Sequence, residues 1–364
     1  MKDVIVSYGE IMARFSPDNN KRFRQAMPGS LNVTFAGAES SVAVSLKMLG
    51  SKTRFVTALP KHSIADACED AVRRFGVDTS CILRTDEGRL GLYFMETGAN
   101  QRPSQVVYDR ADSSVALTPG DAYDWDSIFS DAMWFHISGI TQAISKEAAE
   151  ASILAVRKAK EAGVTVSCDL NFRKKLWDWE PGTSARGLAE KTIRRLLKYV
   201  DVIIANEEDA HDVLGIKAGE SNVEAGKLDI ARYPDVAKQI HQQFPHVSHV
   251  AITLRESLSA NHNNWGAMLY TCKDGSADFA PLGDGEYKPY QIQNIVDRLG
   301  GGDSFSAGLI YGLSGEFKDS PKDALEFAVA ASCLCHSIEG DFNYSSYEEV
   351  MALKSGSTTG RVSR

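Results

Sequence analysis

The sequence has few cysteines, little excess charge and no long apolar segment. Its six cysteines among 364 residues form no C-x-x-C pair and no dense framework, so we expect reduced thiols. The net charge of −8 argues against nucleic acid as a partner, although backbone N–H groups can hold polyphosphate on an acidic protein. No run approaches the roughly 20 apolar residues of a spanning helix, and no signal-peptide apolar region opens the chain. We therefore expect no membrane partner and a cytoplasmic location.

Short apolar runs alternate with helical patterns along most of the chain. The alanine-rich segment 145–162 is predicted to be a helix that Ser145 caps and Gly163 ends. The predicted strands include the near-continuous apolar runs 4–6, 55–59, 133–137, 164–168, 202–205 and 250–254. This rhythm is typical of βαβ units, and such runs favour strands that helices cover on both faces. We predict an α/β fold with a doubly wound, mostly parallel sheet in a domain spanning residues 1–354, followed by a disordered tail at 355–364.

One region breaks this rhythm. The segments 89–96 and 105–110 are strand-like with no helix between them, which predicts a hairpin. Together with the polar stretch 16–34, they are expected to form a small projecting sheet that closes over a ligand. We therefore predict a β-strand lid from about residues 10–34 and 88–112. If the protein forms a homo-oligomer, we expect the lid to make the contact.

The strongest local signal is the stretch 297–308, in which a strand-like entry breaks into three glycines and then a helix. Glycines at 300, 301 and 302 let the backbone turn N–H groups toward one point, and the helix adds its positive end. Asp303 in the first helical turn would lie beside that point and could accept a proton from an attacking hydroxyl. The sequence thus predicts a general base and an anion hole in one unit. The alternative is that Asp303 only caps the helix and the glycines only make a tight turn.

The pattern Asp-x-x-Gly-x-Gly-Asp at 297–303 resembles the second signature of the ribokinase-like (PfkB) carbohydrate kinases, with every fixed position filled. The first signature, Gly-Gly followed by an Asn and an alanine-rich helix, is matched more loosely at 36–43. Ala36 replaces a glycine there, and Ser41 stands where Asn is usual. This change weakens the case for substrate binding through a side-chain amide at position 41, although a hydroxyl could still make one such hydrogen bond.

Further segments resemble the 2-keto-3-deoxygluconate kinases within that family, namely 9–12, 108–110, 136–140, 169–173 and 340–343. The resemblance implies a ribokinase-like core with a strand lid, with ATP and Mg2+ as co-substrates. It also implies transfer of the γ-phosphate to the 6-hydroxyl of 2-keto-3-deoxygluconate, which yields 2-keto-3-deoxy-6-phosphogluconate. The matching positions imply that Asp303 is the base and that residues 300–302 are the anion hole. Around the sugar acid they imply Gly37, Tyr108, Arg110, Asn171, Arg173 and Asp341.

A 2-keto acid carries a carboxylate, which arginines recognise through charge-assisted hydrogen bonds. Arg110 and Arg173 are the candidates, and a kinase of a neutral sugar would have less need of both. Each could instead be a solvated surface arginine. Tyr93 and Tyr108 on the predicted lid could hydrogen-bond sugar hydroxyls, or they could be ordinary lid packing.

The segments expected near the nucleotide match the family's motifs less closely. The stretch 206–209 resembles the family's Asn-x-x-Glu element, so Asn206 would contact the phosphates and Asp209 would hold Mg2+ through water. The three acids of this stretch, Glu207, Glu208 and Asp209, could instead simply favour a helix N-terminus. Thr253 and Arg255 occupy the place of a usual Lys-x-Gly element, with Arg255 in place of the glycine, and a predicted loop at 255–266 with a polar insertion follows. The resemblance also places Cys333 and His336 on the helix beside the adenine, where plain packing is the alternative.

Three rival interpretations remain open. The first keeps the fold and changes the acceptor to fructose, ribose or a nucleoside. The second is a non-catalytic sugar or nucleotide sensor, which would not need the intact Asp303 and glycines. The third is a dinucleotide-dependent dehydrogenase, which the absence of Gly-x-Gly-x-x-Gly in the first βα unit disfavours.

Overall fold

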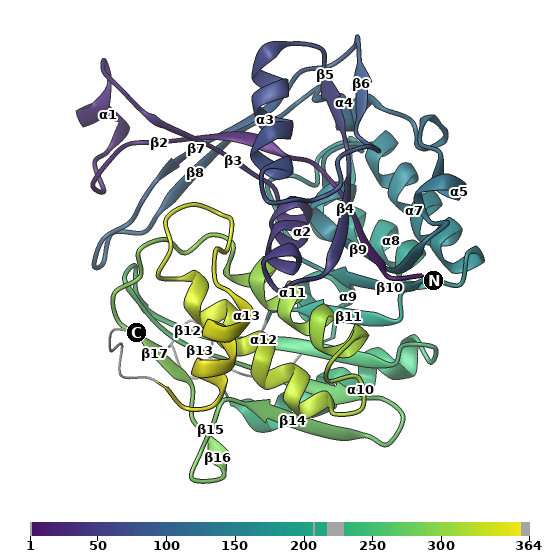
Figure 1. Ribbon diagram of the computed structural model, residues 1–364, viewed down its shortest axis with the longest axis vertical. Helices are drawn as coiled ribbons and strands as arrows, with labels where there is room; N and C mark the ends of the chain where they lie inside the picture. Colours follow the sequence, from purple (N-terminus) through teal and green to yellow (C-terminus); the bar gives the residue numbers. More distant parts are fainter. Residues whose placement is uncertain (1, 207, 217–228, 358–364) are drawn as a thin grey trace.

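A computed structural model describes residues 2–206, 208–216 and 229–357, and it is built around one large sheet (Figure 1). This sheet is nine-stranded within the described part of the chain. Its parallel strands follow the spatial order β12 (His249–Ser259), β11 (Val202–Ala205), β10 (Thr165–Asp169), β9 (Ala132–Ser138), β1 (Val4–Tyr8) and β4 (Lys52–Val56). Antiparallel strands extend the β12 edge, namely β13 (His262–Thr271), β14 (Ser276–Ala280) and β17 (Tyr290–Ile292). The predicted mostly parallel α/β sheet is confirmed.

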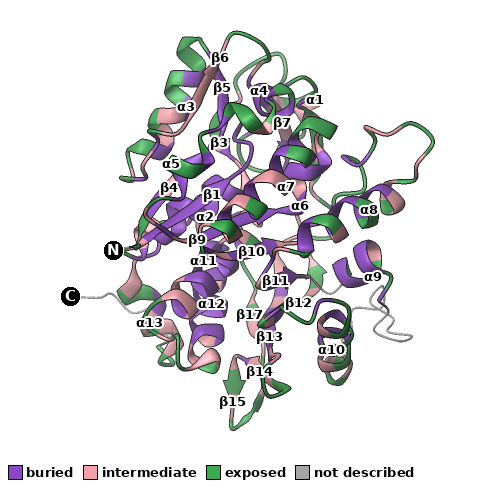
Figure 2. Cartoon of the chain, turned by 90° about the vertical axis from the view of Figure 1, so that its right-hand side faces the viewer, coloured by how far each residue is buried: buried purple, intermediate pink, exposed green. Residues whose placement is uncertain are grey.

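Helices cover both faces of the sheet, which explains why strands such as β1 and β11 are apolar at nearly every position. In β11, Ile203 packs into the core on one face and Ile204 into the core on the other. The first core includes residues of α7 (Lys146–Glu161), α8 (Ala185–Leu197) and α10 (Tyr233–Gln243). The second includes residues of α2 (Ala38–Met48), α11 (Gly301–Ser314) and α12 (Pro321–Cys335). Figure 2 shows the buried residues concentrated on the strands and on the inward sides of these helices.

The remaining elements are shorter and connect these layers. The helices are α3 (Ser63–Arg73), α4 (Ser114–Leu117), α5 (Trp125–Ile128), α6 (Gly139–Ala143), α9 (Asp209–Leu214) and α13 (Tyr347–Lys354). The small strand pairs are β5 (Ala58–Pro60) with β6 (Leu83–Thr85), and β15 (Leu282–Gly283) with β16 (Glu286–Tyr287). Among the described residues, no helix is both long and apolar enough to cross a bilayer.

A second sheet of four strands projects from the main body (upper left in Figure 1). Its order is β3 (Asn32–Ala36), β2 (Met12–Ser16), β7 (Gly91–Glu96) and β8 (Gln105–Asp109), and the short α1 (Phe23–Ala26) lies in the β2–β3 connection. The antiparallel pairing of β7 with β8 confirms the predicted hairpin. Alternate residues of each strand face opposite sides, so Tyr93 is buried on one face while its neighbour Phe94 stacks on Phe15 on the other, with ring centroids 5.3 Å apart. We call this sheet the lid sheet.

Local sequence signals set several element boundaries where they were expected. Helix α7 begins at Lys146 because the Ser145 hydroxyl accepts a hydrogen bond from the Ala148 N–H at 2.9 Å. It ends at Glu161, and Gly163 continues the chain with a φ of 71°. Most of the predicted disordered tail, residues 358–364, lies outside the described residues.

Candidate active site

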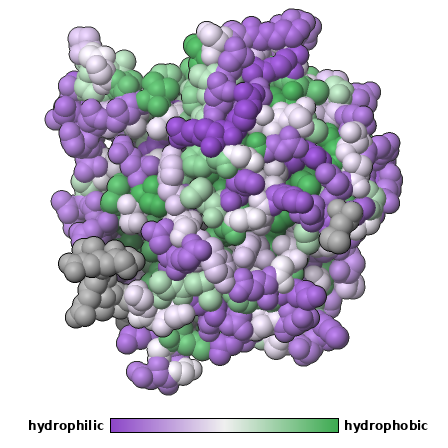
Figure 3. All heavy atoms as spheres, in the orientation of Figure 1, coloured by the Kyte–Doolittle hydropathy of each residue, from purple (hydrophilic) through white to green (hydrophobic). Residues whose placement is uncertain are grey.

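An open cleft of about 450 Å³ lies between the lid sheet and the carboxyl ends of the parallel strands. Figure 3 shows the surface hollowed beneath the projecting lid sheet. Strand β10 contributes Asp169 at its end, the lid sheet contributes Met12, and Leu299 precedes α11 at the floor. The predicted site residues that line the cleft are Gly37, Tyr93, Tyr108, Arg110, Asn171, Arg173, Asn206, Asp209, Thr253, Arg255, Gly300, Gly301, Gly302, Asp303, His336 and Asp341. The remaining predicted residue, Cys333, is not part of this lining.

The turn at residues 300–302 leads directly into α11. Gly300 has a φ of 78°, and a Cβ there would lie 2.3 Å from the Asp341 carbonyl oxygen, so both its conformation and its surroundings require glycine. The Ser304 N–H donates to the Gly300 carbonyl at 2.8 Å. Within the described chain, the N–H groups of residues 301–303 have no backbone acceptor. These unpaired donors and the positive end of the helix make the turn suited to an anion.

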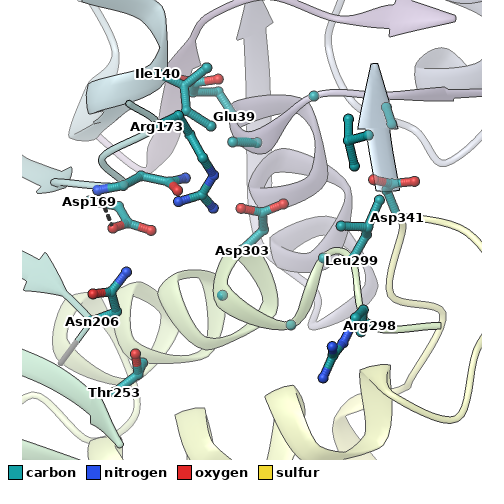
Figure 4. A pocket seen from close by; sticks show the side chains of 18 of the residues that line it. Glu39, Ile140, Asp169, Arg173, Asn206, Thr253, Arg298, Leu299, Asp303 and Asp341 are labelled. Atoms are coloured by element: carbon teal, nitrogen blue, oxygen red, sulfur yellow. Dashed lines mark hydrogen bonds between the residues drawn. The ribbon is translucent and has the colours of Figure 1, made fainter. Parts of the chain in front are cut away.

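Asp303 stands beside these donors, in the first turn of α11. Figure 4 shows its carboxylate directed into the cleft, toward Arg173 and Glu39. It accepts no hydrogen bond from the described residues, and burial raises its pKa well above the usual 3.8 of an aspartate. The negative charges of Asp169, Asp341 and Glu39 raise the pKa further, whereas Arg173 lowers it. The arrangement provides a carboxylate that is free to take a proton.

Glu39 and Asp169 are cleft residues that the sequence did not identify as functional. One oxygen of Glu39 accepts hydrogen bonds from the Ser138 N–H at 3.0 Å, the Ser138 hydroxyl at 2.7 Å and the Thr141 hydroxyl at 2.7 Å. Burial raises the pKa of Glu39 and raises that of Asp169 to about 8. A glutamate just after the Gly37 turn, on an otherwise small and apolar helix, was the available signal for Glu39.

The residues predicted to hold the sugar acid differ in how far they are already paired. The Tyr93 hydroxyl donates to the Asp341 carboxylate at 2.9 Å. Arg110 is 6% exposed and donates through Nε to Glu10 at 2.6 Å, so the alternative of a solvated surface arginine is wrong for it. The Tyr108 ring lies 5.7 Å from the Arg110 guanidinium carbon, measured to the ring centroid. Arg110 is therefore neutralised by an acid that sequence spacing did not reveal.

Gly37, Asn171 and Arg173 are the other cleft residues predicted to contact the sugar acid. A Cβ at Gly37 would lie 2.0 Å from the Glu10 carbonyl oxygen, so this turn needs glycine for close backbone approach. Asn171 has a φ of 38° and donates its N–H to Asp169 at 3.1 Å. Arg173 is exposed, and its guanidinium donates to the Phe172 carbonyl at 3.0 Å. Since Arg173 forms no ion pair within the described chain, it is more available to an incoming anion than Arg110.

At the other end of the cleft, Asp209 holds the loop that precedes α9. Its two carboxylate oxygens accept the N–H groups of Phe172 at 3.1 Å and Asn206 at 3.0 Å. Asn206 in turn accepts the Asp209 N–H at 2.9 Å. The donor set of amide and carboxylate oxygens fits a hydrated Mg2+, but the occupied oxygens of Asp209 fit contact through water better than direct ligation. Glu207, in the same predicted element, lies outside the described residues.

Of the residues predicted to lie near the nucleotide, Thr253 and Arg255 lie on β12 and His336 follows the end of α12. The predicted loop at 255–266 is wrong, because β12 continues to Ser259 and pairs with β13 from His262, so the polar insertion is a hairpin. Arg255 stands opposite Trp265 in that hairpin, and the Thr253 hydroxyl donates to the Ala205 carbonyl at 3.4 Å. The His336 ring packs on Trp265 at a centroid distance of 5.3 Å. An aromatic wall therefore lines this end, to which Cys333 does not contribute.

Comparison with known proteins finds carbohydrate kinases among both sequences and solved structures. Residues 2–343 match the pfkB family of carbohydrate kinases. A 2-dehydro-3-deoxygalactonokinase of Haloferax volcanii is 30% identical over 357 residues, 98% of each chain. The crystal structure of a 2-dehydro-3-deoxygluconokinase of Thermotoga maritima is 42% identical, with a TM-score of 0.87 over 98% of this chain and 99% of that one. A fructokinase of Xylella fastidiosa with bound ATP shares the fold at 21% identity, with a TM-score of 0.75 over 98% and 100% of the two chains.

Proposed function

The chain belongs to the PfkB family of carbohydrate kinases, and on that premise we propose that it transfers the γ-phosphate of ATP to the 6-hydroxyl of 2-keto-3-deoxygluconate. The product would be 2-keto-3-deoxy-6-phosphogluconate. The observation that carries the proposal is the unpaired Asp303 carboxylate beside the unpaired amides of residues 301–303, on the floor of one cleft. The ATP-bound fructokinase of the same fold supports ATP as the donor.

In the proposed reaction, the acceptor hydroxyl lies against Asp303 and loses its proton to that carboxylate as the oxygen attacks the terminal phosphorus. The amides of residues 301–303 would stabilise the charge on the transferring group, because they have no backbone acceptor and lie at the positive end of α11. The raised pKa of Asp303 suits this role, since it makes the ionised carboxylate a stronger base than that of an ordinary aspartate. Mg2+, held through water near Asn206 and Asp209, would neutralise phosphate charge.

The polar groups of the substrate end support a sugar acid over a neutral sugar. Arg173 is exposed at the cleft and would bind the carboxylate of the acid. Arg110 is already paired with Glu10, so its role would be to orient the substrate together with Tyr108 rather than to neutralise it. Tyr93 and Asp341 would exchange their mutual hydrogen bond for bonds to substrate hydroxyls. Closure of the lid sheet over the acid would exclude water and so suppress hydrolysis of ATP.

The lid sheet also offers a surface for a second copy of the chain. Val33 and Val107 are 53% and 58% exposed on its outer face, beside the Phe15 and Phe94 stack. We therefore extend the proposal to a homo-oligomer that buries this outer face. Replacing Val107 with lysine should shift the chain toward a monomer in analytical ultracentrifugation. A wild-type chain that is monomeric at high micromolar concentration would contradict this part of the proposal.

An acceptor panel tests the substrate assignment. Purified protein, MgATP and a coupled assay for ADP would be combined with 2-keto-3-deoxygluconate, its C4 epimer 2-keto-3-deoxygalactonate, fructose and ribose. The relative from Haloferax volcanii makes the galactonate epimer the second candidate. We expect the two acids to be turned over far better than the neutral sugars, with 31P NMR showing a phosphate ester on a CH2 group. Equal turnover of fructose would refute the acid assignment, and ligand binding without turnover would favour the sensor.

A further inference from the structure

Arg14 links the lid sheet to the loops on both sides of the glycine turn. It lies on β2 and is 3% exposed. Its Nη2 lies 2.6 Å from the Asp297 carboxylate, and its Nη1 lies 2.7 Å from the Asp341 carboxylate. Arg14 itself does not line the cleft, so it cannot touch a substrate there. Any effect of Arg14 on the reaction must therefore pass through the two acids.

The two acids fix the backbone around the glycine turn. Asp297 accepts the Leu299 N–H at 3.2 Å through one oxygen and the Gly340 N–H at 3.2 Å through the other, so it ties the start of the turn to the loop that carries Asp341. The Asp341 carbonyl packs against Gly300, where a Cβ would come within 2.3 Å. A shift of either acid would thus move the amides that precede Asp303.

The lid sheet holds Asp341 from two neighbouring strands. Arg14 on β2 stands opposite Tyr93 on β7 in the sheet register. Arg14 donates to one Asp341 oxygen, and the Tyr93 hydroxyl donates to the other at 2.9 Å. Both oxygens of this carboxylate are therefore held by the lid sheet.

From this geometry we propose that Arg14 is a positioning residue for phosphoryl transfer. It holds the glycine turn at residues 300–302 and Asp341 in a fixed position relative to the lid sheet. The inference rests on the proposed kinase function. The guanidinium suits this role because its planar fork can donate to two carboxylates at once, which a lysine ammonium on a flexible stem does less well. Without it, the buried Asp297 carboxylate and the partly buried Asp341 carboxylate would lie near each other with no cation between them. We expect them to move apart and to carry the glycine turn and Asp341 with them.

Arg54 provides a matched control. It lies on β4, where its Nε is 2.8 Å from the Asp78 carboxylate and its Nη1 is 2.8 Å from the Asp131 carboxylate. Arg54 therefore also bridges two acids, but none of these three residues lines the cleft. A substitution at Arg54 also removes two ion pairs, to acids that are more exposed than Asp297 and Asp341, while leaving the glycine turn untouched.

The test compares Arg14→Met with Arg54→Met in the full-length chain. In Arg14→Met, we expect kcat/KM for the sugar acid to fall by about 100-fold, a loss typical of a misplacement near 1 Å at the reacting groups. In Arg54→Met, we expect kcat/KM to stay near the wild-type value at a temperature well below both melting points. Arg14→Lys keeps one positive charge and should recover part of the lost activity. Amide hydrogen exchange should accelerate at Leu299 and Gly340, whose N–H groups donate to Asp297, in Arg14→Met alone.

The exchange measurement separates this inference from the proposed function. If wild type turns over no acceptor but Arg14→Met still accelerates amide exchange at Leu299 and Gly340, the kinase assignment fails while the coupling stands. If wild type is active and a folded Arg14→Met keeps both its activity and its exchange protection, the positioning role is refuted. Should Arg14→Met fail to fold, Arg14→Lys answers the same question, and wild-type kcat/KM and exchange in that variant would overturn the inference.

Discussion

Two aspartates of the cleft have similar positions but differ in whether their carboxylates accept hydrogen bonds. Asp209 and Asp303 both lie in the first turn of a helix, and burial raises the pKa of each. Asp209 gives both oxygens to backbone N–H groups, so it holds a loop in place. Asp303 accepts no hydrogen bond within the described chain and faces the cleft beside unpaired amides. Hydrogen-bond partners, rather than residue type or position in a helix, therefore distinguish a structural carboxylate from one available for chemistry.

The largest expected effect separates these two aspartates. Asp303→Asn should lower kcat by about 10³-fold, because an amide cannot accept the hydroxyl proton. Its melting temperature should not fall, since no hydrogen bond to the carboxylate is lost. Asp209→Asn should lower the free energy of unfolding by about 1–3 kcal/mol, because an NH2 group would then face a backbone N–H. The measurements are steady-state kinetics and thermal melts of both variants beside wild type. A loss of stability with unchanged kcat in Asp303→Asn, together with a loss of kcat with unchanged stability in Asp209→Asn, would contradict the distinction.

The same contrast, between a side chain with an ionic partner and one without, applies to the two arginines predicted to contact the sugar acid. Arg173→Met should raise KM for the sugar acid by about 10- to 100-fold, the value of a hydrogen bond to a charged group, with little loss of stability. Arg110→Met should lower the melting temperature as well, because it leaves Glu10 buried without its cation. The measurement is KM and melting temperature for each variant. A large stability loss in Arg173→Met together with an unchanged KM would show that its exposure in the cleft has no part in binding.

The pH dependence should show the raised pKa of Asp303. Because the base must be ionised, kcat/KM should rise as the pH increases through that pKa, with a midpoint well above the usual 3.8 of an aspartate. Arg173 lowers this pKa, so Arg173→Met should move the midpoint to still higher pH. Profiles of kcat/KM for wild type and variant provide the check. A midpoint that shifted toward acid in the variant would contradict the electrostatic account.

The smallest expected effect concerns the two residues predicted to lie near the adenine, one in α12 and one at its C-terminal end. Cys333→Ala should change KM for ATP by less than about twofold, because Cys333 does not line the cleft. His336→Ala should raise KM for ATP more, since it removes a ring of the aromatic wall against Trp265. Initial rates at varied ATP concentration distinguish the two variants. A larger effect at Cys333 than at His336 would show that the nucleotide lies elsewhere.

The parts of the site that the sequence predicted are local in the chain. The strand rhythm, the lid hairpin and the turn at 300–302 follow from patterns within about a dozen residues, where propensity and glycine content decide the conformation. Arg110 pairs with Glu10, and Arg14 pairs with Asp297, across 100 and 283 positions of sequence. No periodicity connects residues so far apart, so these ion pairs required the fold. The hairpin at 255–266 was missed because a polar insertion resembles a loop when its pairing strand is unknown.

The central claim is that Asp303 acts on the acceptor hydroxyl after both substrates have bound. The most direct test is single-turnover transfer from γ-32P-labelled ATP to the sugar acid by Asp303→Asn, with binding of each substrate measured separately by calorimetry. The account predicts affinities close to those of wild type and a transfer rate lower by about 10³-fold. Transfer at the wild-type rate by an Asp303→Asn protein that binds both substrates would contradict it.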